Sequence, residues 1–353
     1  MSDLGIMAVK IDAIYPHINA DKLEIVKIGA YQTCETKGKY QVGDIVAHFP
    51  PDILIPPKVA IQLGVENYLK DAVYPGDSEK SKCRVGAIRL RGAASFGFTV
   101  KVDVEAGTDL TDRFHGVKYE PPEPEWFRVG DHAKNDPRFH IYTDIQNYRN
   151  SKYRNAIPLG TLVRLTEKCH GTNSRVGLID NEFMCGSHKC SMKSLDKLEH
   201  PSIYWNPLTS NMKDMLRCIS DGGKNVIAFG EIYGSKVQFM DYGRFGADGY
   251  VLFDISVDGN YLNWDQIVYY TTRFCVPTVP LLYSGPFDYE VVEQLVDGET
   301  ILGDKVHMRS SFKGREGVVI TPLTETFSPV LGGRLILKAV SCDYLECRKS
   351  DSH

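Results

Sequence analysis

The chain lacks several features that would assign it to a special class of protein. No two of its nine cysteines have the CxxC spacing, and the closest pairs are Cys185 with Cys190 and Cys342 with Cys347. There is no run of about 18 apolar residues, no secretory leader pattern and no internal repeat. These absences predict reduced thiols rather than a disulfide framework or a zinc site, and no membrane span. We therefore expect an intracellular protein, cytoplasmic or nuclear.

An excess of positive charge is also missing. The 353 residues include 41 Lys and Arg against 45 Asp and Glu, which gives a formal net charge of −4. Any polyanionic partner must therefore bind a local basic surface. One such cluster lies before residue 104 and contains Arg84, Arg89, Arg91, Lys80, Lys82 and Lys101. Arg84, Arg89 and Arg91 are our candidates for nucleic-acid contacts, although a solvated strand edge that discourages pairing explains the charges equally well.

The N-terminal part predicts a small β-barrel. Short β-like runs, separated by turn signals, occupy residues 6–14, 23–29, 45–49, 83–90 and 96–102. A proline-rich segment around Pro121–Pro124 predicts a semi-rigid linker. We expect a barrel domain over residues 1–106, a linker over 107–138, a second domain over 139–346 and a tail over 347–353. A hydrophobic content of 42% is enough for a core in each domain.

The second domain mixes strands with helices, so its fold class is predicted to be α+β, with antiparallel sheets and attached helices. Helices are expected at 191–199, 209–220, 264–274 after Asn263, and 289–296 after Asp288. Asp258-Gly259-Asn260 predicts a hairpin turn. The polar and aromatic segment 142–153 fits either a helix or a clamp over this domain.

One lysine stands at the end of a predicted strand and just before a glycine. The run Thr161–Leu165 alternates apolar and polar residues, and Thr166-Glu167-Lys168-Cys169-His170-Gly171-Thr172-Asn173 follows it. With an ordinary pKa of about 10.4, Lys168 is a nucleophile only if burial or nearby cations favour its neutral form. A surface lysine before a hairpin is the competing interpretation. Strand alternation predicts that Cys169 points away from Lys168, and we assign it no chemistry.

Four more β-runs carry a charged or aromatic residue downstream of Lys168. In order, they contain Glu231 in FGEIYG, Phe253 in YVLFDI, Glu316 and Val318 in REGVVI, and Lys338 in LILKAV. Taken singly, each glutamate fits a surface or salt-bridged residue and Phe253 fits a core residue. Taken together and in this order, the five segments resemble the motif series of the covalent nucleotidyltransferases, which include polynucleotide ligases and messenger RNA capping enzymes.

The resemblance narrows to RNA ligases. DNA ligases usually have aspartate at the place of His170 and arginine at that of Asn173. The N-terminal segments Asn19–Leu23 and Ile88–Gly92 are similar to the OB domain of the Deinococcus-type RNA ligases. That family is ATP-dependent, seals 3′-hydroxyl/5′-phosphate nicks in duplexes, and carries its OB domain before an ATP-grasp-like catalytic domain. The resemblance therefore implies a nicked RNA duplex as the partner, and we expect a monomer.

The resemblance implies a role for each matched residue. Lys168 takes AMP from ATP through a phosphoramide bond, and Lys338 neutralises the α-phosphate. Glu167 accepts from the adenine amino group, and the base stacks between Phe253 and Val318. Further expected nucleotide contacts are Asn173, Gly171, which lets a phosphate-bearing ligand approach the backbone, and His170, which either touches metal or packs.

The two downstream glutamates are implied to form the metal site. Glu316 binds a divalent ion or its waters, and Glu231 holds ribose or metal-bound water. Hard oxygen ligands suit Mg²⁺ or Mn²⁺. The catalytic set is therefore expected to be Lys168, Glu231, Glu316 and Lys338.

Two places depart from the family pattern. Where RNA ligases commonly have Ser-Arg after the first hairpin, this chain has Ser187-His188-Lys189. The last motif usually has two lysines separated by one residue, yet Ile336 and Val340 flank Lys338, and Arg334 is the nearest substitute. A DNA ligase, a capping guanylyltransferase and a non-catalytic RNA-binding OB protein remain alternatives to an RNA ligase.

Overall fold

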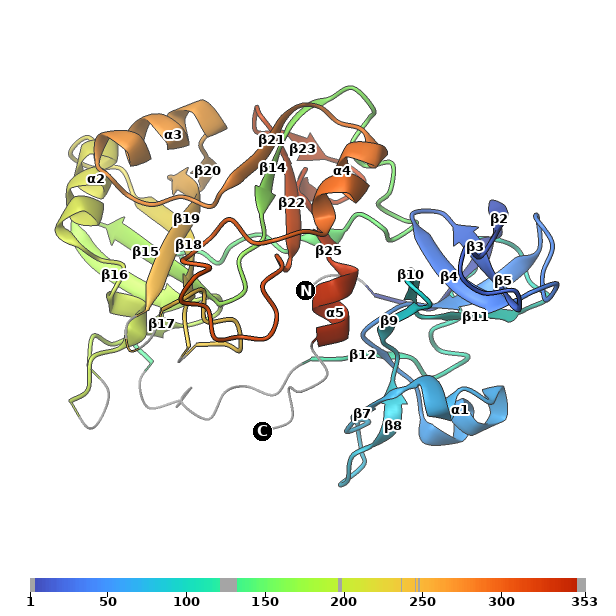
Figure 1. Ribbon diagram of the computed structural model, residues 1–353. Helices are drawn as coiled ribbons and strands as arrows, with labels where there is room; N and C mark the ends of the chain where they lie inside the picture. Colours follow the sequence, from blue (N-terminus) through green and yellow to red (C-terminus); the bar gives the residue numbers. More distant parts are fainter. Residues whose placement is uncertain are drawn as a thin grey trace. The chain divides into compact units, whose positions relative to one another are not determined.

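The computed structural model describes residues 4–120, 132–195, 199–235, 237–244, 246 and 248–347. The chain forms two compact units (Figure 1). The first comprises Met1–Pro122, Gln146–Asn155 and Val340–His353, and the second comprises Glu123–Ile145 and Ala156–Ala339. Most strand pairs are antiparallel and the helices are few, so the α+β class is confirmed. No described helix has both the length and the apolar character needed to cross a membrane.

The first unit is built from short strands in several small sheets. One sheet has the order β1-β5-β11, a second β2-β3-β4, a third β10-β9 and a fourth β12-β6-β8-β7. The strand bounds are β1 Met7–Lys10, β2 Ala13–Pro16, β3 Leu23–Ile28, β4 Tyr31–Thr36, β5 Ile45–Phe49, β6 Ile53–Leu54, β7 Lys70–Ala72, β8 Ser81–Arg84, β9 Ala87–Leu90, β10 Ala93–Phe96, β11 Phe98–Lys101, β12 Val117–Lys118 and β13 Gln146–Asn147. The unit also contains α1 (Pro57–Leu63), the 3-10 helix η1 (Glu66–Tyr68) and α5 (Cys342–Cys347).

The strands expected in this part are present, but the described residues do not form one closed barrel. Between β4 and β10, side chains replace part of the backbone ladder. The Cys34 N–H donates to Ser95 Oγ at 3.0 Å, and Gln32 Nε2 donates to the Ala94 carbonyl at 2.7 Å. A common core still holds the unit together, because Ile6, Phe49 and Ile53 are fully buried in one cluster.

The second unit contains two larger sheets. One includes the order β25-β22-β14-β21 and the other has the order β17-β16-β15-β18-β19-β20. Their bounds are β14 Leu162–Glu167, β15 Thr172–Ile179, β16 Glu182–Ser187, β17 Ser191–Met192, β18 Val226–Tyr233, β19 Gly249–Val257, β20 Asn260–Tyr261, β21 Leu281–Pro286, β22 Gly317–Pro322 and β25 Leu337–Val340. The short pair β23 (Phe327–Ser328) and β24 (Gly333–Arg334) is separate.

Three helices of this unit begin where the sequence predicts. They are α2 (Ser210–Ser220), α3 (Trp264–Arg273) and α4 (Tyr289–Val296). Thr209 accepts from the Met212 N–H, Asn263 forms a capping box with Gln266, and Asp288 accepts from the Glu290 N–H. Helices α2 and α3 cover one face of the β15–β19 sheet (Figure 1).

Some expectations differ from the structure. The prediction of a helix at 191–199 is wrong for its first residues, because Ser191 and Met192 form β17 against β16. Residues 196–198 lie outside the described residues. The chain turns into the 3-10 helix η3 at Ile203–Trp205 instead. The predicted hairpin at 258–260 is confirmed between β19 and β20. The proline-rich linker at 121–124 and most of the expected tail also lie outside the described residues.

Candidate active site

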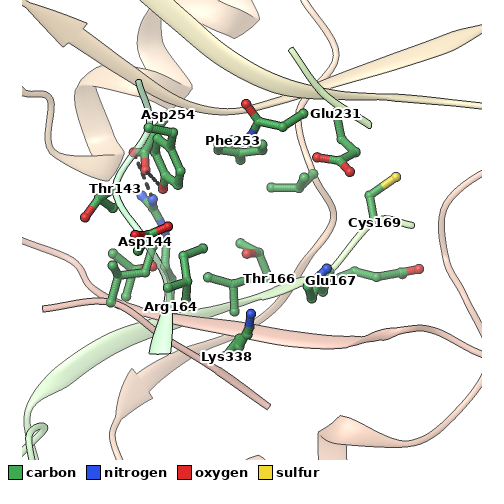
Figure 2. A pocket seen from close by; sticks show the side chains of 18 of the residues that line it. Thr143, Asp144, Arg164, Thr166, Glu167, Cys169, Glu231, Phe253, Asp254 and Lys338 are labelled. Atoms are coloured by element: carbon green, nitrogen blue, oxygen red, sulfur yellow. Dashed lines mark hydrogen bonds and ion pairs between the residues drawn. The ribbon is translucent and has the colours of Figure 1, made fainter. Parts of the chain in front are cut away.

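A cavity of about 300 Å³ lies between the two large sheets of the second unit (Figure 2). One wall comes from the sheet that contains β14 and β22, and the other from the sheet that contains β18 and β19. The cavity is lined by Tyr142, Thr143, Asp144, Ile145, Arg164, Thr166, Glu167, Lys168, Cys169, Asn173, His188, Glu231, Phe253, Asp254, Val279, Val319, Thr321, Ile336 and Lys338. The structure therefore brings side chains from all five predicted motif segments to one site.

Strand β14 and the residue directly after it supply three side chains to one wall. Arg164, Thr166 and Lys168 occupy alternate positions, and successive side chains of a strand point to opposite faces. Glu167 lies between these positions, so its side chain points to the opposite face. Its carboxylate accepts from the Thr300 hydroxyl and from the Ile301 N–H at 2.8 Å, and burial raises its pKa. Although Glu167 borders the cavity, its carboxylate is thus held on the other side of the strand.

Lys168 forms a close ion pair. Its Nζ lies 2.7 Å from Glu316 Oε1, although the two residues are far apart in the sequence. Burial acts to lower the pKa of Lys168, but Glu316 and Glu231 outweigh burial, so the pKa is raised. The lysine is therefore an ammonium in this state. Burial alone would favour the neutral nucleophile, and the two carboxylates prevent it.

Glu231 and Asn173 face each other as register partners on β18 and β15. Burial raises the pKa of Glu231 to about 8, Lys168 acts to lower it and Glu316 raises it further. The Oδ1 atom of Asn173 is buried and has no hydrogen-bond partner among the described residues. Since a buried acceptor without a partner is costly, this atom is suited to a ligand hydroxyl.

Phe253 enters the cavity because β19 contains a bulge. In the pairing of β18 with β19, Phe229 is opposite Asp254 and Gly230 is opposite Leu252, which leaves Phe253 as the extra residue. A bulge of this kind redirects a side chain. Figure 2 shows the Phe253 ring at the cavity wall.

The other apolar wall is Val319 rather than Val318. Val319 pairs with Thr166, lies on the cavity side and lines the site, whereas Val318 pairs with Glu167 and is fully buried. The sequence position was off by one residue, which on a strand moves the side chain to the other face.

Gly171 and His170 do not line the cavity. A Cβ atom at Gly171 would meet the carbonyl oxygen of Ile232, so the glycine is needed for the close approach of β18, not of a ligand. The His170 N–H donates to the Tyr242 hydroxyl at 2.8 Å, and its Nδ1 lies 3.7 Å from Glu316 Oε2. His170 thus lies behind the Lys168–Glu316 pair.

Cys169 does line the cavity, contrary to the prediction from strand alternation. The alternation does not hold there because β14 ends at Glu167.

Arg334, the nearest substitute for the second lysine of the last motif, lies outside the cavity. Lys338 and Ile336 both line the cavity, but Arg334 does not. The Arg334 guanidinium donates to Glu325 at 2.6 and 2.8 Å and to Asp254 at 3.0 Å, and it lies 3.5 Å over the Tyr261 ring. Arg334 is thus held in a structural network.

His188, and not the exposed Lys189, reaches the cavity. Burial together with Arg175 and Lys189 lowers the pKa of His188.

Sequence reasoning missed Arg164, Asp254 and Tyr142 as cavity residues. Asp254 is 1% exposed, and it receives the Tyr142 hydroxyl at 2.5 Å and an Arg164 Nη2 contact at 3.4 Å. Strand alternation carried the signal for Arg164, because it stands four residues before Lys168 on the same strand. The position of Tyr142, in a segment without a clear pattern, had no such signal.

The site has a chemistry that suits a divalent cation. Glu316 and Glu231 bring two carboxylates next to one ammonium, and their mutual repulsion contributes to the raised pKa of Glu231. Carboxylate oxygens of this kind are suitable ligands for Mg²⁺ or Mn²⁺. Among the described residues, no group of three or more His, Cys, Asp or Glu is placed to hold a metal ion by itself.

The basic cluster of the first unit is largely paired. Arg84 is 4% exposed, donates to Asp52 at 2.7 and 2.9 Å, and stacks 3.8 Å over the Tyr119 ring. Arg89 donates to Asp343 at 2.6 Å, while Lys82 and Lys101 pair with Asp71 and Asp44. Arg91 is exposed, in a left-handed turn with φ 49°. The cluster is therefore an edge of ion pairs with Arg91 at its surface.

Comparison with known proteins adds independent findings. Solved structures of Naegleria gruberi RNA ligase have a similar fold. One mutant with ATP and Mn is 21% identical, with a TM-score of 0.75 over 99% of this chain and 100% of that chain. Another mutant with AMP and Mn is 21% identical, with a TM-score of 0.74 over 98% of this chain and 99% of that chain. A comparison with curated proteins gives no match.

A family model supplies the stronger link. The model described as RNA ligase matches residues 161–340, which is just over half of the chain. The matched range begins at β14 and ends at β25, so it contains Lys168, Glu231, Phe253, Glu316 and Lys338. Apart from segment 142–145, every residue that lines the cavity thus lies within the matched region. The chain belongs to the RNA ligase family.

Proposed function

We propose that this RNA ligase is ATP-dependent and joins 3′-hydroxyl and 5′-phosphate ends through a lysyl-AMP intermediate on Lys168. The observation that carries the proposal is the Lys168–Glu316 pair at 2.7 Å, beside a cavity that also contains an aromatic ring and a second lysine. The similar Naegleria structures with ATP or AMP and Mn support the same nucleotide and a divalent ion here.

In the first step, neutral Lys168 Nζ attacks the α-phosphorus of ATP. A nitrogen–phosphorus bond forms, the bond to the pyrophosphate oxygen breaks, and pyrophosphate leaves. The ammonium must lose a proton before it attacks. The ion pair between Lys168 and Glu316 must therefore separate first, because the Glu316 contact raises the pKa of the lysine. A Mg²⁺ or Mn²⁺ ion bound by Glu316 and Glu231 would supply positive charge at the phosphates.

The remaining cavity residues hold the nucleotide. Adenine stacks between Phe253 and Val319, which takes the place expected for Val318. Asn173 Oδ1 accepts from a ribose hydroxyl, and Lys338 neutralises the α-phosphate. A contact of Glu167 with the adenine amino group stays a prediction, since the carboxylate must first exchange its bonds to Thr300 and Ile301.

Two further steps complete ligation. AMP moves from Lys168 to the 5′-phosphate of RNA, and a 3′-hydroxyl then attacks that phosphate and releases AMP. We infer a Deinococcus-type enzyme that acts as a monomer on nicks in duplexes, with an OB-type N-terminal module over 1–106 that contacts RNA. Of the three arginines in the basic cluster, Arg91 is best suited to a phosphate contact, because Arg84 and Arg89 are ion-paired.

The direct test is nucleotide labelling followed by sealing. Purified protein is treated with radiolabelled ATP or GTP, and mass spectrometry locates the adduct. We expect AMP on Lys168, no adduct in Lys168→Ala, and sealing of nicked duplexes that contain RNA. Labelling by GTP alone would instead indicate a capping guanylyltransferase, and AMP on another lysine would refute the assignment of Lys168.

A further inference from the structure

Arg164 is a buried cation at the end of the cavity away from Lys168. It is 4% exposed, and its guanidinium lies 4.2 Å over the Trp264 ring. Among the described residues, the guanidinium contacts one acid, from Nη2 to Asp254 Oδ1 at 3.4 Å. The Nε atom is buried and has no hydrogen-bond partner within the described residues. A buried charged donor without a partner is costly, so Arg164 presents an unused donor at the cavity wall.

The neighbouring carboxylate is already shared with other donors. Asp254 already accepts from the Tyr142 hydroxyl at 2.5 Å and from Arg334 Nη1 at 3.0 Å. Arginine has donors only, whereas a threonine hydroxyl can also accept. Thr321 is the register partner of Arg164, is 3% exposed and lines the same end of the cavity. This end therefore presents a fixed donor beside a hydroxyl that can accept.

The order of residues along β14 sets what faces this pair. The α-phosphate must lie at Lys168. Thr166 and then Arg164 come before Lys168 on the same side of the chain, and each is about 7 Å from the next, since a strand rises 3.3–3.4 Å per residue. Thr166 pairs with Val319, the apolar wall opposite the Phe253 ring, so a base stacked there lies between Lys168 and Arg164. Figure 2 shows Arg164 and Asp254 grouped at one end and Glu231 and Cys169 at the other. The far edge of the base thus meets Arg164 and Thr321.

We propose that Arg164 and Thr321 read the purine: Arg164 Nε donates to N1 of adenine, and the Thr321 hydroxyl accepts from the adenine amino group. Guanine has a donor at N1 and an acceptor in place of the amino group. The N1 contact would then set two donors against each other, so Arg164 would stay unpaired in the presence of GTP. The Thr321 hydroxyl could still turn and donate to the guanine oxygen, so Arg164 carries the discrimination. Arg164 is therefore a specificity-determining residue of the first step. This inference rests on the proposed function.

The test removes one ligand atom and one protein group in turn. Single-turnover formation of enzyme-bound AMP or its analogue is measured with ATP and with 1-deaza-ATP, in which a C–H replaces N1. In the wild type, we expect 1-deaza-ATP to be slower in kcat/KM by roughly 10- to 100-fold, as for a lost bond to a charged donor. Arg164→Lys keeps the charge but lacks the Nε donor. In this variant ATP itself should react more slowly, so most of the difference in kcat/KM between ATP and 1-deaza-ATP should vanish.

Arg334→Lys is the matched control. It disturbs the same carboxylate, Asp254, but Arg334 does not line the cavity, so the full 1-deaza penalty should remain. If Arg164→Lys does not fold, Thr321→Val tests the second contact, because its rate with purine riboside triphosphate should approach its rate with ATP. A wild type without a 1-deaza penalty, or an Arg164→Lys variant that keeps the whole penalty, would overturn the proposal. Absence of any adduct with ATP would instead refute the proposed function.

Discussion

The Nζ atom of Lys168 lies 2.7 Å from Glu316 Oε1. This pair places the proposed nucleophile and a candidate metal ligand in direct contact, and it raises the pKa of the lysine. For the proposed reaction this arrangement is a resting state, in which the lysine is charged and cannot attack. The pair must separate before the first step, and any cation that Glu316 binds would promote the separation.

Glu316→Ala should impair more than one step. Two like charges about 4 Å apart cost on the order of 4 kcal/mol at an effective dielectric of 20, so a carboxylate beside a polyphosphate is useful only with a cation between them. We expect adenylation by ATP and sealing of a pre-adenylated nick each to slow by roughly 100-fold or more, with partial rescue by raised Mn²⁺. Glu299→Ala, which changes a 77% exposed side chain, is the control. A wild-type adenylation rate across a Mg²⁺ titration would make Glu316 a structural carboxylate.

Gly171→Ala should destabilise the second unit and slow adenylation. A Cβ atom there meets the backbone of Ile232, which cannot move without shifting β18 and Glu231. Overpacking of this kind costs about 1–3 kcal/mol, which denaturant unfolding can measure. Gly223→Ala, where a Cβ atom meets nothing within 4 Å, should leave both stability and rate unchanged. Equal behaviour of the two variants would show that the β18 backbone yields easily.

Arg84→Met should lower stability rather than act on RNA binding alone. Arg84 is buried, and its removal takes away the two hydrogen bonds that the Asp52 carboxylate, which is 27% exposed, accepts from it. We expect a loss of about 2–4 kcal/mol in the unfolding free energy of the first unit. Lys82→Met breaks a pair whose side chains are 52% and 60% exposed, so it should cost less than about 1 kcal/mol. An unchanged unfolding curve together with weakened RNA binding would return Arg84 to the nucleic-acid surface.

His48 should make the first unit sensitive to acid. Burial lowers its pKa to about 4, and its Nε2 lies 2.8 Å from the Phe96 carbonyl oxygen. The unfolded chain, with a histidine pKa of about 6.5, then binds more protons than the folded one between pH 6.5 and 4. Stability therefore falls as the pH drops through this range, by up to about 3 kcal/mol.

Unfolding of His48→Gln at pH 7 and pH 4 checks this expectation. The variant should lose much less stability on acidification than the wild type does. His307→Gln, which alters a 70% exposed side chain, should behave like the wild type. If the wild type and His48→Gln lose the same stability, other groups control the acid response.

Local patterns determined much of this protein. Residues that cap helices, such as Thr209, Asn263 and Asp288, act over a single turn, so the starts of α2, α3 and α4 could be predicted. The family was also evident from five short segments in order, because each motif is a short contiguous segment with its own candidate site residue. Strand alternation indicates which residues share a face, but it gives no partner across the sheet.

Only the tertiary structure decided the contacts between distant segments. The register of β14 against β22 selected Val319 over Val318, and the bulge in β19 turned Phe253 into the cavity. Side-chain pairing neutralised Arg84, which the sequence leaves as a free cation. Lys168 and Glu316 are 148 residues apart, and nothing near either residue indicates the other. Sheet register and packing fix such pairs, since they depend on how whole strands align rather than on local sequence.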